Sequence, residues 1–581
     1  MPTAGALEVF RHALKSTVEE MGVTLQRTAY STNIKIRRDH TCALFDADLR
    51  HVAQHDVAPQ HIGTLITMVP ETVEERGDDL APGDGILIND PYRGEGSIHL
   101  PDVAVVSPLF HEGEIVGYAA NSAHHVDIGG STPGGIPNDS TELFAEGLIL
   151  PGVKGIEDWA FDEEILKLIT RNVRGSEMRL GDYRAQLAAN RVGQERYADL
   201  VETHGRDGLE ARLDALLEYT ERRVRSAIGE LPDGTYRAED EMDGDGVVDE
   251  PVRLALTLEV DGDELTIDFT GTAEQNTGPL NCTPALAFAG TLYSIMALLG
   301  KDLPKNEGFY RPFETITPEG TMVNPKPDAP VAAGAEVAVR AAELVLDALA
   351  DAVPERTIAS GKGTICNIAY GGEDPRNDGR YVYYETVAGG YGARAEKDGM
   401  EAVQAHFQNT ANSPIEELET EIPLYVRRYE LIEDSGGAGR TRGGLGVRRD
   451  LEFYDHEASF SVLAERADSR PWGLFGGRPG RAAEYGVYTA DDGDPDDSER
   501  SYTALRSKAT VSLAPGDVVS VRTPGGGGYG DPLERPRAAV RDDVVDGKLS
   551  RACAREEYGV VVDADGAVDD ERTDELRGES G

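Results

Sequence analysis

The stretch that decides the fold runs from residue 99 to residue 127 and reads HLPDVAVVSPLFHEGEIVGYAANSAHHVD. Apolar residues at 103–106, 109–110 and 115–116 flank four polar, turn-like residues, His111-Glu112-Gly113-Glu114. This pattern predicts a β-hairpin with a polar tip. Such a hairpin returns the chain, so that the second motif, AHHVD, lies beside the first, HLPD.

Imidazoles and carboxylates are concentrated in these two motifs. His99 and Asp102 bracket a proline that fixes the local backbone, so two donors three residues apart can converge on one ion. Nitrogen and oxygen ligands together suit a borderline divalent metal such as zinc, manganese or iron. The sequence therefore predicts a metal site, whose other donors come from AHHVD; His111, at the hairpin tip, is excluded. The alternative is a hydrogen-bonded core pair or a surface cluster.

Three further histidines precede this stretch, His51, His55 and His61. They either supply additional ligands or a substrate contact, or are polar loop residues.

Chain length, hydrophobicity and cysteine content limit the class of protein. The chain of 581 residues is long enough for several domains and large cores. No window approaches the ~20 apolar residues that cross a bilayer, and the N-terminus lacks a signal-peptide pattern. Four widely spaced cysteines without a CxxC pair predict free thiols. We expect a soluble, unexported, cytoplasmic protein.

The net charge of −48 argues against nucleic acid and anionic membranes as partners, because so acidic a chain repels phosphate groups. The basic residues are mostly arginine, and the acids are spread along the whole chain. This pattern is typical of a halophilic protein, whose surface charge is screened by salt.

Apolar periodicity predicts helices over residues 4–28, 161–172, 208–228 and 331–353, and alternation over 234–269 predicts a hairpin with its turn at 261–263. Strands and helices do not alternate regularly, which favours an α+β fold over a doubly wound one. We expect four regions: a helical, metal-site region (1–233), a central α+β region (234–423), a β-rich region with glycine motifs (424–535) and a C-terminal extension (536–581). The extension ends in an acidic tail from residue 563 that is expected to be disordered.

Two glycine-rich segments, residues 436–446 and 524–531, resemble phosphate-binding loops only superficially. Neither has the Lys-Ser/Thr ending of a P-loop, and the first leads into a predicted strand instead of a helix. Tight turns and close backbone approach explain the glycines better. Arg440 and Arg442 are retained as candidates for holding a carboxylate or phosphate.

Ordered motifs along almost the whole chain resemble the hydantoinase B/oxoprolinase family, which includes the metal-bearing subunit of acetone carboxylase. Besides HLPD and AHHVDIGG, the motifs are NDPY (89–92), DFTGT (268–272), GPLN (278–281), NEG (306–308), GGYGAR (389–394), NSPIE (412–416) and DSGGAG (434–439).

The resemblance implies ATP-dependent hydrolysis of a cyclic amide such as hydantoin, N-methylhydantoin or 5-oxoproline. A hydantoinase A-like partner would bind ATP and phosphorylate the substrate, and this B-type subunit would complete hydrolysis in a hetero-oligomer. In the carboxylase relatives the equivalent subunit holds manganese and joins an activated ketone to carbon dioxide.

Carried over residue by residue, the resemblance implies His99, Asp102 and His124 as metal ligands. Asp127 is the next candidate, and His125 or Asp127 would take a proton from the attacking water. Asp90 is either a ligand or a group that orients one. Glu142 and Glu146 are expected to cap or support a helix; the alternative is that they, too, are ligands or orient one. Two alternatives to hydrolysis remain, a carboxylase-type subunit and a non-catalytic scaffold.

Overall fold

The structure is a computed structural model that describes residues 4–55, 57–61, 63–76, 79–94, 97–300, 302–377, 379–404, 406–490 and 501–578. Its helices are α1 (Ala4–Thr28), α2 (Thr32–Lys35), α3 (Thr64–Arg76), α4 (Glu163–Asn172), α5 (Ser176–His204), α6 (Arg206–Ile228), α7 (Pro284–Leu299), α8 (Glu307–Tyr310), α9 (Gly334–Ala348), α10 (Ile415–Glu421), α11 (Arg537–Val545), α12 (Arg551–Glu556) and α13 (Asp570–Gly578).

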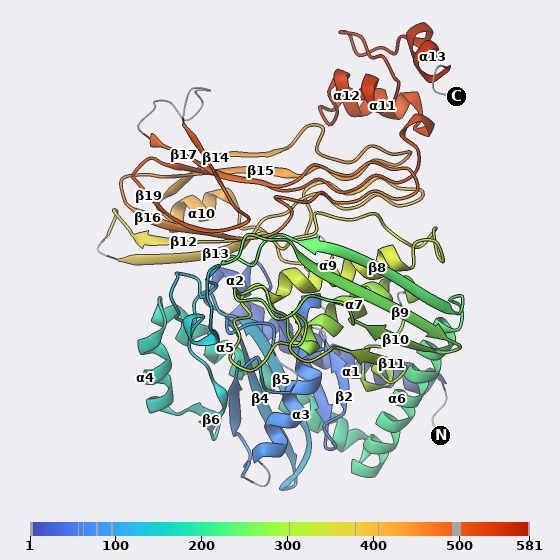
Figure 1. Ribbon diagram of the computed structural model, residues 1–581. Helices are drawn as coiled ribbons and strands as arrows, with labels where there is room; N and C mark the ends of the chain where they lie inside the picture. Colours follow the sequence, from blue (N-terminus) through green and yellow to red (C-terminus); the bar gives the residue numbers. More distant parts are fainter. Residues whose placement is uncertain are drawn as a thin grey trace.

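The strands of the described residues form four sheets (Figure 1). In spatial order the first is β2 (His51–Gln54), β1 (His40–Asp46), β5 (Glu114–His124), β4 (Asp102–His111), β3 (Gly85–Ile88), β6 (Pro151–Glu157) and β7 (Ala160–Phe161). The second is β11 (Phe313–Ile316), β10 (Glu264–Asp268), β9 (Val252–Asp261) and β8 (Gly234–Met242). The third is β13 (Arg380–Thr386), β12 (Asn367–Glu373), β16 (Ala458–Leu463) and β19 (Lys508–Leu513). The fourth is β14 (Leu424–Leu431), β15 (Val447–Phe453), β20 (Val518–Arg522), β17 (Glu484–Tyr488) and β18 (Tyr502–Leu505).

Both predicted hairpins are confirmed. Strands β4 and β5 are antiparallel and end in the pair His111↔Glu114, with Glu112 and Gly113 at φ 50° and 87° in the turn. Two residues of positive φ are what a tight type I′ hairpin turn requires. Strands β9 and β10 likewise close at Asp261↔Glu264. Mixed helices and antiparallel sheets confirm the predicted α+β class.

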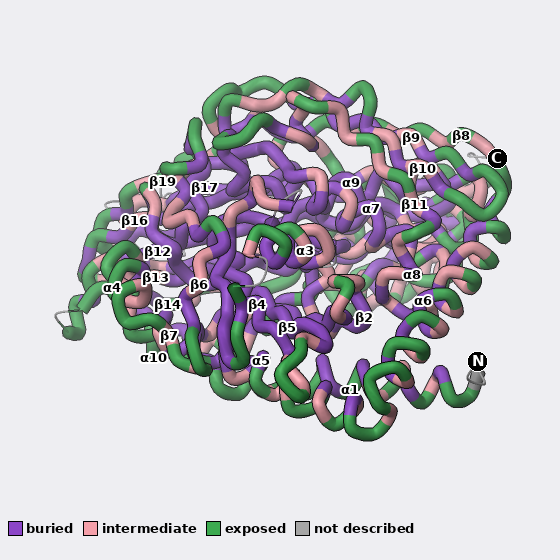
Figure 2. The backbone as a smooth tube through the Cα atoms, turned by 90° about the horizontal axis from the view of Figure 1, so that it is seen from below, coloured by how far each residue is buried: buried purple, intermediate pink, exposed green. Residues whose placement is uncertain are grey.

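The predicted helices are present, but two long ones were missed. Helix α5 covers one face of β4 and β5, and its buried side mixes the polar residues Arg179, Asp182, Gln186 and Asn190 with apolar ones such as Ala185, Ala189 and Tyr197, which obscures the apolar stripe. Helix α7 packs against α9 and is apolar on nearly every side, so it shows no helical periodicity. Figure 2 shows the sheet interior as buried and the outer turns of α4 and α6 as exposed.

The third and fourth sheets face each other across a common core. Side chains such as Ile368 and Phe460 of one sheet pack with Leu451 and Val519 of the other. The third sheet takes strands from both sides of residue 424, where a region boundary was expected. The 234–423 and 424–535 regions therefore share a sheet.

A bundle of glycine-rich extended segments lies beside these sheets, with residues 525–528 at its centre. A methyl group at Gly525 or Gly528 would overlap the carbonyl oxygen of Ser435 or Ala438, one at Gly526 that of Tyr391, and one at Gly527 that of Trp472. Gly525 and Gly528, three residues apart, thus contact the same neighbouring segment, as expected for an extended helix with three residues per turn. The segments hydrogen-bond to one another, for example Gly437 N to Gly526 O (2.8 Å) and Gly527 N to Ser360 O (2.8 Å). Close backbone approach is therefore the reason for these glycines.

The C-terminal tail contradicts its prediction, because α13 covers residues 570–578 where disorder was expected; residues 579–581 lie outside the described part of the chain. Thr573 is fully buried and its hydroxyl accepts a hydrogen bond from Val561 N (3.1 Å). Arg537 also forms ion pairs with Asp570 and Asp574. These contacts order the acidic segment on α11, at one end of the molecule (Figure 1).

Candidate functional site

The hairpin brings the three predicted metal ligands together. Asp102, the first residue of β4, lies directly opposite His124, the last residue of β5. His99 precedes β4, with its Nε2 3.1 Å from Asp102 Oδ2 and its ring centroid 5.0 Å from that of His124. All three side chains are buried. His111 lies at the far end of the same hairpin, as expected.

Two further side chains join this group, Asp39 and His61. Asp39 immediately precedes β1, and its carbonyl oxygen accepts a hydrogen bond from His124 N (3.0 Å). His61 Nε2 lies 3.4 Å from Asp39 Oδ1 and 3.9 Å from Asp102 Oδ1. We call Asp39, His61, His99, Asp102 and His124 the His–Asp cluster.

Sequence reasoning missed Asp39. Its only local sign is structural: the preceding Arg38 has φ 60°, a left-handed conformation that bulky residues rarely adopt. His61 is one of the three upstream histidines considered as further ligands, and it lies within reach of the carboxylate of Asp102. His51 instead packs against the rings of Phe45 and Tyr310.

Burial and mutual charge govern protonation in the cluster. Burial by itself would raise the pKa of Asp102, but the adjacent His99 imidazole outweighs it and lowers that pKa below its usual value. Burial would lower the pKa of His99, yet the Asp102 carboxylate raises it overall. The pKa of Asp39 is also lowered, since a hydrogen bond from His61 and nearby imidazoles outweigh burial. Burial lowers the pKa of His124 to about 4.

An outer layer of hydrogen bonds fixes the His124 ring. Asn33 Nδ2 contacts His124 Nδ1 (3.0 Å) and donates to its carbonyl oxygen (2.7 Å). The fully buried Arg37 donates to Asn33 Oδ1 (2.7 Å), Tyr384 O (2.7 Å) and Thr386 Oγ1 (3.0 Å). The Tyr384 ring stacks on His124 at 4.7 Å between centroids, and the Arg37 guanidinium lies 4.8 Å from the Tyr384 centroid.

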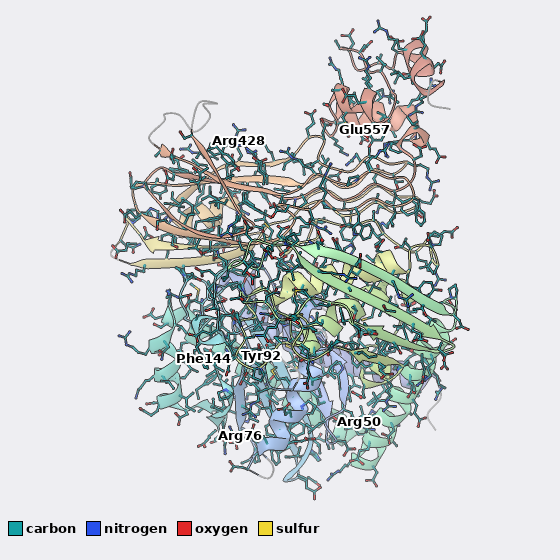
Figure 3. All side chains as sticks on the ribbon, viewed as in Figure 1. Arg50, Arg76, Tyr92, Phe144, Arg428 and Glu557 are labelled. Carbon is teal, nitrogen blue, oxygen red and sulfur yellow. The ribbon has the colours of Figure 1, made fainter. Side chains whose placement is uncertain are left out.

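The loop that carries His99 is held from both ends. Asn89 donates to Leu100 O (2.7 Å) and accepts from Leu150 N (2.6 Å). Tyr92, labelled in Figure 3, donates to Ala329 O (2.7 Å). His99 Nδ1 lies 3.3 Å from Ala332 O. These bonds account for the NDPY motif, which positions the loop.

The structure does not bring the other predicted catalytic residues into the cluster. His125 packs on α5, where its ring lies 4.4 Å from that of Tyr183 and its Nε2 3.0 Å from Gln186 Oε1; burial lowers its pKa to about 4. Asp127 is buried and accepts from Gly129 N, Gly134 N and Arg174. Asp90 accepts from Tyr92 N in a local turn (3.0 Å).

The remaining candidates have structural contacts. Glu142 precedes a short 3-10 turn without capping it through its side chain. Glu146 is buried and accepts from Ser140 and from the backbone of Val331 and Ala332, so it supports the segment beside His99 and not a helix. Arg440 donates to Ala395 O, and the buried Arg442 pairs with Glu401 (2.8 Å).

Several buried polar atoms of the cluster make no hydrogen bond: Nε2 of His124, Nδ1 of His61 and Oδ1 of Asp102, whose Oδ2 is ion-paired with His99 (3.1 Å). Such atoms are costly unless they gain a partner, and buried carboxylates usually are paired or bind metal. As placed, no three His, Cys, Asp or Glu side chains of the described residues are arranged to hold one ion together. The donor types and their unpaired atoms thus fit a divalent metal, although the side chains are not already gathered around one point.

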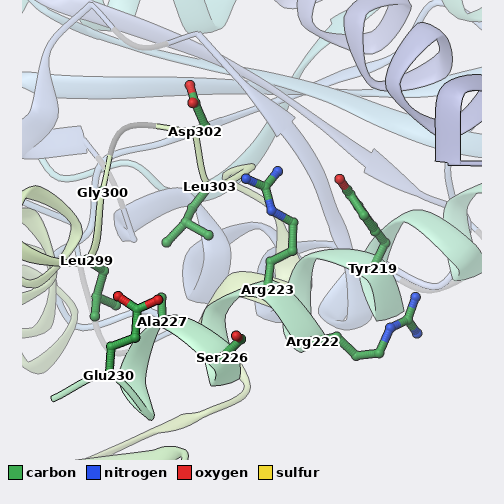
Figure 4. Close-up of a pocket in the computed structure, with 10 residues that line it drawn as sticks. All are labelled: Tyr219, Arg222, Arg223, Ser226, Ala227, Glu230, Leu299, Gly300, Asp302 and Leu303. Carbon is green, nitrogen blue, oxygen red and sulfur yellow. The ribbon is translucent and has the colours of Figure 1, made fainter. Parts of the chain in front are cut away.

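A separate hollow of about 450 Å³ lies between α6 and a segment that contributes Leu299, Gly300, Asp302 and Leu303 (Figure 4). Its lining includes the charged residues Arg222, Arg223, Glu230 and Asp302 and contains none of the predicted site residues. Across the described residues, every helix is too short or too polar to cross a lipid bilayer.

Comparisons with known proteins agree with these motifs. The profile of the Hydantoinase B/oxoprolinase family matches residues 4–532. A Pseudomonas sp. (strain NS671) protein, provisionally named as the B-type subunit of a D-/L-hydantoinase, is 35% identical over 588 residues, covering 98% of this chain and 97% of the relative. The crystal structure of the ATP-dependent caprolactamase from Pseudomonas jessenii is 31% identical with a TM-score of 0.89, over 100% of both chains. A nucleotide-free acetone carboxylase structure shares the fold, with a TM-score of 0.91 at 21% identity over 99% of this chain and 82% of that one. The chain belongs to the hydantoinase B/oxoprolinase family.

Proposed function

We propose that this chain is the B-type subunit of an ATP-dependent cyclic-amide hydrolase that opens a hydantoin, N-methylhydantoin or 5-oxoproline ring. The observation that carries the proposal is the buried His–Asp cluster, whose unpaired donor atoms lie at one end of the β4–β5 hairpin. Family membership supports the reaction class, because relatives are named hydantoinase, 5-oxoprolinase and caprolactamase.

His99, Asp102 and His124 would hold a divalent manganese, zinc or iron ion, with Asp39 and His61 beside them. A bound metal would polarise a reacting oxygen or activate a water molecule. Asn33 and Tyr384 keep the His124 ring in place, and Arg37 holds Asn33. Burial of all five cluster residues keeps bulk water from competing.

A hydantoinase A-like partner would bind ATP and phosphorylate the substrate, since the glycine segments of this chain serve close packing. His125 and Asp127, the expected proton acceptors, lie outside the His–Asp cluster, and their contacts with Gln186 and Arg174 support a positioning role instead.

The first test is metal content by elemental mass spectrometry on protein purified in high salt without chelator. We expect about one manganese, zinc or iron per chain, lost in His99→Ala and Asp102→Asn and kept in the control His111→Ala. Absence of metal from every sample would contradict the metal site.

The second test adds the A-type partner and follows ADP and ring-opened product from each of the three rings. ATP-dependent ring opening that disappears in Asp102→Asn supports the proposal. ATP turnover that requires bicarbonate and incorporates it would indicate the carboxylase reaction instead. Full activity of both cluster variants would indicate a scaffold subunit.

A further inference from the structure

A cavity of about 750 Å³ opens beside β14, lined by Ala388, Met400, Tyr429 and residues 402–404 and 409–416. We call it the Asn412 pocket. Its volume is in the range of small-molecule sites. The pocket contains the NSPIE motif (412–416), which takes no part in the His–Asp cluster.

The lining is almost free of charge. Of its fourteen residues, Glu416 alone is charged, although 28% of all residues in this chain are. Among the described residues that line the cavity there is no lysine or arginine. A phosphate or carboxylate would find no cation there and would meet Glu416, so the lining suits an uncharged ligand.

The neutral polar groups of the pocket are already oriented. Asn412 Nδ2 donates to Thr386 O (2.6 Å) and Glu385 Oε2 (3.1 Å), and its Oδ1 accepts from Tyr429 (3.3 Å). Gln404 Nε2 donates to Thr386 Oγ1 (3.2 Å). An amide oxygen can accept two hydrogen bonds, so Asn412 Oδ1 and Gln404 Oε1, which each accept one from the protein, can accept another from a ring N–H. Asn409 donates one Nδ2 hydrogen to Val57 O (3.1 Å) and has a second for a ring C=O, while Val403 and Ile415 offer apolar wall.

A short hydrogen-bonded path joins the pocket to the His–Asp cluster. Thr410 Oγ1, on the pocket wall, lies 2.8 Å from Thr386 Oγ1. Thr386 accepts from Arg37, Arg37 donates to Asn33, and Asn33 contacts His124 Nδ1. The same arginine therefore supports both sites.

From the pocket's neutrality, its fixed amide groups and this path, we propose that the Asn412 pocket binds the cyclic amide as a neutral ring. The inference rests on the proposed hydrolase function and narrows it. Hydantoin, N-methylhydantoin and unsubstituted lactams fit, whereas 5-oxoproline, which carries a carboxylate at neutral pH, does not; the ring would bind here before the partner phosphorylates it.

The test measures binding of hydantoin, 2-pyrrolidinone, 5-oxoproline and inorganic phosphate to the full chain by saturation-transfer NMR and calorimetry. Ala411→Trp fills the pocket without removing a hydrogen bond, and Ala211→Trp, on the exposed side of α6, is the matched control. We expect the two neutral rings to bind, and Ala411→Trp to weaken them at least about tenfold. The control should bind as the wild type does.

Thr410→Val, which keeps the side-chain shape and removes the hydroxyl, replaces Ala411→Trp if that variant does not fold. Binding of phosphate or 5-oxoproline as tight as that of the neutral rings overturns the inference, as does unchanged or undetectable binding of the neutral rings. The failures are separable. If the partner complex of Ala411→Trp opens the ring with wild-type KM, the pocket assignment fails and the hydrolase function stands. If neutral rings bind but ATP-dependent ring opening is absent, the pocket assignment stands and the hydrolase function fails.

Discussion

Asp102 and His124 lie directly opposite each other across β4 and β5, although twenty-one residues separate them in the chain. A two-residue turn and a β-bulge at Leu109–Phe110 together set this register. Side chains alternate between the faces of a strand, so a slip by one residue would present His125 in place of His124. The site thus depends on both the turn at the far end of the hairpin and the bulge beside it.

Asp39 is expected to belong to the metal site. Replacing it with asparagine keeps its shape and removes its charge, so metal affinity should fall by about 10- to 100-fold. Metal titration followed by elemental analysis measures this. The control is Asp48→Asn, at a side chain that is 81% exposed. Equal affinity in both variants would place Asp39 outside the site.

Arg37→Lys should destabilise the protein by about 2–3 kcal/mol, because one ammonium cannot replace three directed hydrogen bonds from a buried guanidinium. Chemical unfolding in high salt measures the loss. Arg222→Lys, at an exposed side chain, should change stability by less than about 0.5 kcal/mol. A loss of stability no greater than that of Arg222→Lys would show that the three hydrogen bonds of the Arg37 guanidinium are not needed for stability.

Gly526→Ala should be strongly destabilising, by about 3 kcal/mol or more, because its methyl group would overlap the carbonyl oxygen of Tyr391. Gly208→Ala in α6 meets nothing nearer than 3.5 Å and should be neutral or stabilising, by up to about 1 kcal/mol. Thermal unfolding of the two variants compares them. Similar melting temperatures of Gly526→Ala and Gly208→Ala would mean that the glycine-rich segments can move apart to accommodate a methyl group.

Acid stability should depend on His51. Burial lowers its pKa to about 4, below the value near 6.5 of an unfolded chain. The folded state therefore binds fewer protons between these values, so His51 contributes stability above pH ~6.5 that is lost as the pH falls toward ~4. His51→Phe, which keeps an aromatic ring beside Phe45, should flatten this dependence by about one proton. Melting temperatures of the wild type and His51→Phe from pH 4 to pH 7 measure this dependence. The same slope of melting temperature against pH in both proteins would exclude a contribution from His51.

The hairpin and the HLPD and AHH motifs could be predicted because turn chemistry and alternation are local. Asp39 could not be predicted, since no spacing links it to residues sixty positions later. Helix α5 was missed because Gln186 and Asn190 face the sheet, donating to the carbonyls of Val103 (2.7 Å) and Val105 (3.0 Å). Buried polar residues of this kind obscure the apolar stripe.

His125 shows a different limit. Its sequence position beside His124 made it a natural candidate base, yet neighbouring residues at a strand end point to opposite faces. The His–Asp cluster lies on one side of β5, and His125 meets Tyr183 and Gln186 of α5. Strand alternation alone is enough to separate the two histidines.

The three-residue repeat of the glycine bundle restricts how the chain can change in length. Gly525 and Gly528 face residues 435–438, and Gly477 and Gly480 face Gly528 and Gly525 in return. One inserted residue would turn the following segment by a third of a turn and drive side chains into backbone on every side. Insertions or deletions of three residues, one full turn, would keep each glycine pointing toward the same neighbouring segment. These segments should therefore tolerate length changes only in multiples of three residues.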